Sequence, residues 1–185
     1  MIISYHGVEC FKISQGDLSL SINPDSKLSA DVTLFTTDRG ETSDKSGFVI
    51  AGPGEYEIKD IFIKGFISEG TNSQINTIYM ISFEGMNLCF LGNLATTKLP
   101  TETLEAIEEV DILFVPVNSL GAAESYKLAV SLEPSVIIPM QFTDATLKQF
   151  LKEGGEDKVE SLDKFVVKKK DLDDKEGEIV LLNQE

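Results

Sequence analysis

The pattern of apolar residues changes once along the 185 residues of this chain, and this change restricts the fold class. In roughly the first half, short runs rich in β-branched and aromatic residues alternate with turn residues, which predicts strands. In the second half, apolar residues at helical spacing alternate with short and wholly apolar runs. This second pattern predicts helices that connect strands buried on both faces.

The strands predicted in the first half are short. They cover 2–5, 10–13, 18–22, 31–36, 48–50, 56–58, 61–66, 78–83 and 86–92. Glu84-Gly85, between the last two, is typical of a two-residue hairpin turn. No segment of this half has the apolar spacing of a helix.

The second half is predicted to contain three helices and four more strands. The helices begin at Thr101, span 122–132, and run from a cap at Thr143 or Asp144 to Gly154; the strands span 112–117, 136–140, 165–168 and 178–182. Thr101 is the expected cap of the first helix. Its apolar stripe is expected at Leu104, Ile107 and Val110. The last two strands are expected to pair antiparallel across the turn at 170–177.

These elements predict a single domain over residues 1–185, of mixed α/β class. Strands that come first and helix–strand alternation that follows favour two packed sheets with helices on their outer faces. The predicted architecture is a four-layer αββα sandwich.

Composition limits the partners and the location. The net charge of −15 repels the phosphates of nucleic acids and of anionic lipids, so neither is expected as a partner. No apolar run approaches the ~20 residues that span a bilayer, and the N-terminus lacks the pattern of a signal peptide. Cys10 and Cys89 are expected to be buried free thiols, with a disulfide between them left open. A cytoplasmic protein is therefore predicted.

Several short motifs occur in a fixed order along nearly the whole chain. They are SYHGVECF at 4–11, INP at 22–24, GPGEYEI at 52–58 followed by IFIKG at 61–65, NTIY at 76–79 with LGNL at 91–94, and IPMQF at 138–142. In this order they resemble segments of the metallo-β-lactamase superfamily, and among its members the UlaG-like branch of zinc-dependent hydrolases. The resemblance implies the αββα fold and a site for zinc or another divalent metal.

The positions that this resemblance assigns to metal ligands hold unsuitable residues. In the loop after the strand at 31–36 they fall on Thr37, Arg39, Glu41 and Thr42, of which only Glu41 carries a usual ligand. Asn93 stands where the family has its bridging Asp, and Gln141 stands where it has its last His.

Three further differences concern the surroundings of that site. Val8 replaces an early His, Asn23 replaces the Asp before Pro24, and the segment 67–74 contains no His. Without a metal there is no activated water and no Lewis acid for hydrolysis. We therefore predict a catalytically inactive, metal-free protein without a cofactor or a catalytic residue. Its role would be binding or assembly, with an unknown partner or as a homo-oligomer.

Two other hypotheses remain open. His6 is the only histidine, and a structural role is expected for it. A diverged metal-dependent hydrolase would have to use His6 with Asp38 and Glu41, although acids in this loop, Asp44 included, are expected to be solvated. A small-anion site would place Arg39 among the remaining polar positions, which are Thr37, Asn93, Thr96 and Gln141.

Overall fold

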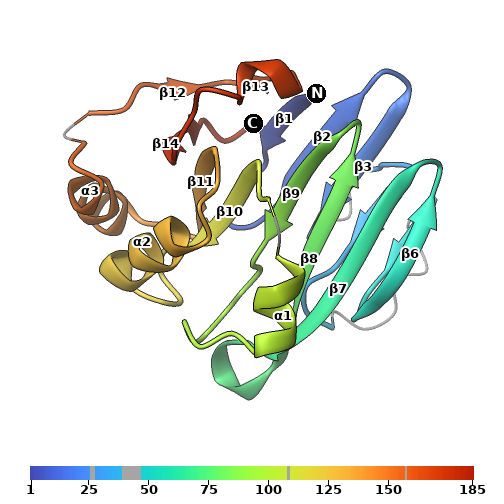
Figure 1. Ribbon diagram of the computed structural model, residues 1–185, viewed down its shortest axis with the longest axis horizontal. Helices are drawn as coiled ribbons and strands as arrows, with labels where there is room; N and C mark the ends of the chain where they lie inside the picture. Colours follow the sequence, from blue (N-terminus) through green and yellow to red (C-terminus); the bar gives the residue numbers. More distant parts are fainter. Residues whose placement is uncertain (26–27, 39–46, 108, 157) are drawn as a thin grey trace.

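The computed structural model describes residues 1–25, 28–38, 47–107, 109–156 and 158–185 (Figure 1). Two large sheets form most of the molecule. The six-stranded sheet has the order β13-β1-β2-β3-β4-β5. Its strands are β1 (Ile2–Tyr5), β2 (Phe11–Gln15), β3 (Leu18–Ile22), β4 (Val32–Leu34), β5 (Phe48–Ile50) and β13 (Phe165–Val166).

The seven-stranded sheet has the order β14-β11-β10-β9-β8-β7-β6. Its strands are β6 (Gly54–Ile58), β7 (Ile61–Glu69), β8 (Ile75–Phe83), β9 (Met86–Phe90), β10 (Ile112–Pro116), β11 (Val136–Met140) and β14 (Glu178–Ile179). From β6 to β9 the neighbours are antiparallel, and from β9 to β14 they are parallel. A small parallel pair joins β12 (Ser161–Leu162) to β15 (Leu181–Leu182).

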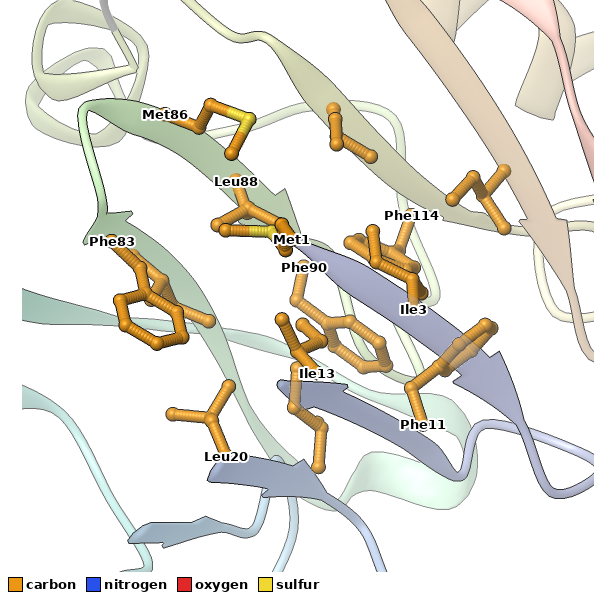
Figure 2. Packing of buried hydrophobic residues seen from close by; sticks show 14 of the residues in the cluster. Met1, Ile3, Phe11, Ile13, Leu20, Phe83, Met86, Leu88, Phe90 and Phe114 are labelled. Carbon is orange, nitrogen blue, oxygen red and sulfur yellow. The ribbon is translucent and has the colours of Figure 1, made fainter. Parts of the chain in front are cut away.

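The main core lies between the two large sheets. Alternate residues of the first sheet, such as Ile3, Phe11 and Ile13, are fully buried against Phe90 and Phe114 of the second (Figure 2). The ring of Phe11 lies 4.8 Å from that of Phe114 and meets it edge-on, a favourable aromatic geometry. The strands themselves were predicted from the β-branched and aromatic residues of these runs.

A second core lies on the other face of the seven-stranded sheet. It contains buried residues of α2 (Ala122–Ser131) and α3 (Asp144–Glu153), and Ile107 at the end of α1 (Thr101–Ala106). The strands β9, β10 and β11 are therefore covered on both faces, which explains their wholly apolar sequences. The mixed α/β fold with two sheets predicted from the sequence is confirmed. Among the described residues no α-helix covers the six-stranded sheet, whose outer face carries half-buried polar side chains such as Lys12 and Ser14.

Two short 3₁₀ helices were not predicted. They are η1 (Thr71–Ser73), between β7 and β8, and η2 (Lys169–Asp171), after β13. The cap of α3 was predicted correctly. The hydroxyl of Thr143 accepts from the amide of Thr146, and the hydroxyl of Thr146 accepts from the amide of Thr143, which forms a capping box.

The prediction for the first helix was partly wrong. Its cap is Pro100, without a side-chain hydrogen bond, and the helix ends at Ala106. Leu104 is 47% exposed, whereas Thr103 is buried. The predicted apolar stripe of Leu104, Ile107 and Val110 therefore does not form, because the helix ends before Ile107 and Val110.

The expected pairing of the last two strands was also wrong. β13 pairs with β1 in the six-stranded sheet, and β14 pairs with β11 in the seven-stranded sheet. The segment between them is no hairpin, since η2 intervenes and the chain crosses from one sheet to the other. No helix among the described residues is long and apolar enough to cross a membrane.

Candidate functional site

Three parallel strands carry polar residues just beyond their carboxyl ends. Asn93 follows β9, Asn118 and Ser119 follow β10, and Gln141 follows β11. These strands are neighbours in the sheet, as Figure 1 shows, so their ends meet at one edge. The fold itself therefore gathers these side chains.

They line a cavity of about 670 Å³. Its polar lining consists of Thr71, Asn93, Asn118, Ser119, Gln141, Asn183 and Gln184, and its apolar lining of Tyr5, Val8, Phe142 and Leu182. This volume is in the range that holds small-molecule ligands. None of these lining residues is ionised at neutral pH, so they form a polar but uncharged surface.

Asn93 and Gln141 contact each other directly. The side-chain amide of Gln141 donates to Oδ1 of Asn93 at 3.2 Å, and the amide of Asn93 donates to the hydroxyl of Thr71. The backbone amide of Asn93 donates to the buried side chain of Asn76 at 2.9 Å. Both polar ends of the Asn93 side chain are therefore occupied by protein groups.

The backbone around the cavity is strained. Val8 and Gln141 have φ values of 53° and 52°, in the left-handed region. Val8 is the clearest outlier, since a β-branched residue rarely adopts this conformation. The amide of Gln141 donates to the carbonyl of Val8 at 2.8 Å, which ties the two sheets together here. Each such residue costs about 1–3 kcal/mol, and such strain clusters at ligand-binding and active sites.

Tyr5 is an uncharged wall of the cavity. Burial, together with the nearby thiol of Cys10, raises the pKa of Tyr5 to about 12. Its hydroxyl donates to the carbonyl of Val8 at 3.2 Å. At neutral pH Tyr5 therefore adds a phenol ring and no negative charge.

Asn23 has a structural role beside this site. Its amide donates to the hydroxyl of Thr36, and its Oδ1 accepts from the backbone amide of Thr36, both at 2.9 Å. Both residues are buried. These two hydrogen bonds connect the segment after β3 to the segment after β4.

The other predicted site residues lie elsewhere. Thr37 is half-buried after β4 and does not line the cavity, and the hydroxyl of Thr96 accepts from the backbone amide of Lys98. The predictions on Arg39, Glu41, Thr42 and Asp44 lie outside the described residues. Asn93 and Gln141 are thus the two members of the predicted set that the described structure brings together.

His6 lines a separate cavity of about 280 Å³ next to the first. Its Nε2 lies 3.1 Å from the hydroxyl of Ser4 and 3.7 Å from a carboxylate oxygen of Glu185. These contacts are those of a histidine held by its neighbours, as expected from the sequence.

Sequence reasoning missed Asn118, Ser119 and the residues of the C-terminal segment. The first two could have been found, because they follow a predicted parallel strand. Asn183 and Gln184 had no such signal. Gln184 reaches the site because it forms a bridge with Tyr5, beside Gly7, whose missing side chain leaves room for it.

The described residues of this cavity do not fit a divalent metal. Zinc is held by thiolates, imidazoles and carboxylates, whereas the wall here offers amides and hydroxyls. The oxygen of Asn93 already accepts a hydrogen bond from Gln141. Within the described part of the chain, no group of three or more His, Cys, Asp or Glu side chains could hold a metal ion.

Comparison with known proteins gives the family. Residues 2–141 match the family described as the Beta-lactamase superfamily domain. The chain belongs to the β-lactamase superfamily. No curated protein matches the sequence.

Solved structures of this superfamily share the fold. The chain is similar to a predicted Zn-dependent hydrolase of the metallo-β-lactamase superfamily from Thermotoga maritima, with 24% identity and a TM-score of 0.81, over 100% of this chain and 99% of that chain. It is also similar to Igni18, a metallo hydrolase from Ignicoccus hospitalis, with 14% identity and a TM-score of 0.64, over 90% of this chain and 99% of that chain. At these identities the likeness shows the β-lactamase superfamily fold alone.

Proposed function

We propose that this β-lactamase superfamily protein is a metal-free binding protein and not a hydrolase. The observation that carries the proposal is the hydrogen bond between Gln141 and Asn93. In the family resemblance these two positions belong to metal ligands, and here they bind each other. A neutral amide pair cannot balance the charge of a divalent ion as a carboxylate does.

The chemistry of the wall supports the same conclusion. A hydrolase of this fold relies on an ion that lowers the pKa of a bound water. An amide is no general base, and Tyr5, with its pKa raised to about 12, holds its proton at neutral pH. The described residues of the cavity thus favour holding a molecule over cleaving one.

The proposal includes a cytoplasmic location and the UlaG-like branch of the superfamily. Cys10 and Cys89 are both buried and form no disulfide, which suits a reducing compartment. The branch rests on the motifs at 52–58 and 61–65.

Metal analysis of the natively purified protein tests the proposal. We expect less than about 0.1 equivalent of zinc, manganese or iron, and no rise in the unfolding midpoint when these ions are added. Near-stoichiometric metal that is lost on chelation together with an esterase or phosphodiesterase activity would contradict it. That result would favour the diverged hydrolase that uses His6, Asp38 and Glu41.

A further inference from the structure

The wall of the cavity contains hydrogen-bonding groups that the protein itself does not use. The hydroxyl of Ser119 is buried and has no hydrogen-bond partner among the described residues. Within the same part of the chain, Oε1 of Gln141 accepts no hydrogen bond. The hydroxyl of Thr146 donates to Oδ1 of Asn118, whereas the side-chain N–H groups of Asn118 donate to no described residue. Asn118 is exposed and Gln141 is half-buried, so water can reach their unused groups. The Ser119 hydroxyl is the buried one of the three, and a buried polar group is normally satisfied, by a protein group, a water or a ligand.

These groups include both donors and acceptors. A side-chain amide presents an N–H and a C=O in one plane, and it pairs with a ligand edge that has a donor next to an acceptor. Glutamine and asparagine recognise the edges of nucleic-acid bases in this way. The unused Oε1 of Gln141 and the unused side-chain N–H groups of Asn118 therefore offer an acceptor and a donor to a planar heterocycle with such an edge.

Two aromatic residues of the lining suit the face of a ring. The ring centroids of Tyr5 and Phe142 lie 6.2 Å apart with an interplanar angle of 30°, so the two rings form a tilted aromatic pair in the lining of the cavity. Leu182 adds an aliphatic contact at the same cavity. Bases stack on such surfaces, and the contact is tolerant of which base is bound.

Charge selects against phosphorylated ligands. The cavity lining contains no Lys, Arg or His among the described residues, and Gln184 precedes the carboxylate of Glu185. The whole protein carries a net charge of −15. An uncharged ligand meets no penalty here, whereas a phosphate would find no cation among the described lining residues to pair with.

We propose that the cavity binds an uncharged nucleoside, with the base edge at Gln141 and Asn118, the base face on Tyr5 and Phe142, and a hydroxyl at Ser119. The volume of about 670 Å³ admits a base together with its sugar. This inference rests on the proposed function, because it takes the cavity to be a metal-free binding site.

Calorimetric titration of the full chain tests it with uridine, cytidine, adenosine and inosine. We expect at least one nucleoside to bind with a Kd between about 10 μM and 1 mM. The 5′-monophosphate of that nucleoside should bind at least about 10-fold more weakly. This comparison uses the unmodified protein, so it does not depend on the folding of a variant.

Matched variants locate the site. Gln141→Met and Ser119→Ala should each weaken binding of that nucleoside by about 5-fold to 50-fold, since each removes one hydrogen-bonding group. Gln15→Met and Ser161→Ala are the controls, because Gln15 lies at the far end of β2 and Ser161 is exposed on β12. These controls should leave the Kd unchanged.

Three results would overturn the inference. They are the absence of binding by all four nucleosides, equal binding of the nucleoside and its monophosphate, and equal effects of Gln141→Met and Gln15→Met. A protein that is free of metal and binds no nucleoside would leave the proposed function standing while this inference fails. Near-stoichiometric metal would instead contradict the proposed function.

Discussion

A Cβ atom at Gly92 would lie 2.3 Å from Oδ1 of Asn76, well inside van der Waals contact. The same oxygen accepts the backbone amide of Asn93, and the amide of Asn76 donates to the carbonyl of Leu91. Gly92 also has a φ of +65°, which disfavours a side chain. The close approach of these two residues therefore fixes the loop that presents Asn93 to the cavity.

Gly92→Ala is predicted to destabilise the protein by at least about 3 kcal/mol, because the new methyl group displaces a fully buried hydrogen-bonded side chain. Gly16→Ala is the matched control. Gly16 also has a positive φ, of +56°, but nothing lies within 4 Å of its Cβ position. It should cost only about 1 kcal/mol. Urea unfolding measures the stability of both variants. Equal losses of stability would show that the close approach of Gly92 to Asn76 does not make Gly92→Ala more destabilising.

The Asn93→Asp, Gln141→His double variant is predicted to gain weak zinc binding. The two side-chain atoms lie 3.2 Å apart, close to the separation of ~3.4 Å between two ligands at ~2.1 Å from a tetrahedral zinc ion. With a Kd of about 0.1 mM, zinc at about 1 mM would add about 1.4 kcal/mol of stability.

Thermal unfolding with zinc and with a chelator measures this gain. The wild-type protein and the two single variants are the controls and should not respond to the ion. A wild-type protein stabilised as much as the double variant would contradict both this prediction and the metal-free proposal.

Much of the fold could be predicted because its signals are local. Short runs rich in β-branched and aromatic residues, such as the one that contains Phe11 and Ile13, indicated strands, and the apolar run before Gln141 indicated a strand covered on both faces. The pairing of β13 with β1 could not be predicted, because the two strands lie about 160 residues apart and share no turn. The burial of Thr103 in place of Leu104 depends on how a single helical turn lies on the sheet, which periodicity over so few residues does not determine.

The candidate site was predictable to a similar extent. Asn93 and Gln141 were expected together from the family resemblance, and parallel strands do bring them into contact. The nature of that contact, an amide pair, follows from side-chain geometry that a sequence does not contain. Gln184 was missed because it reaches the cavity through a bridge to Tyr5, a contact between the two ends of the chain.

Asp31 is predicted to make stability depend on pH in the acid range. Hydrogen bonds from Lys59, at 2.8 Å, and from Ser19 lower the pKa of Asp31 to about 2, below its ordinary value near 4. A lowered pKa in the folded state stabilises the protein above pH ~4, and this contribution disappears as the pH falls through about 2.

Asp31→Asn should therefore be less stable than the wild type at neutral pH and equally stable near pH 2. Urea midpoints across this range measure the difference, with Glu57→Gln, an exposed residue of β6, as the control. Added salt should reduce the effect, since the pair with Lys59 is open to solvent. A difference that stays constant from neutral pH to pH 2 would contradict the assignment.

The thiol of Cys89 is predicted to be protected until the protein unfolds. It lies fully buried in β9, and burial raises its pKa to about 12. At pH 8 its thiolate fraction is then about 1000-fold lower than that of an ordinary cysteine, and the thiolate is the species that reacts.

In a Cys10→Ser background, iodoacetamide should label Cys89 at least about 1000-fold more slowly in the native protein than in about 6 M guanidinium chloride. Adding Gly92→Ala should raise the native labelling rate, because it raises the unfolded fraction. Labelling of the native protein as fast as of the unfolded chain would mean that β9 does not hold this thiol inside the core.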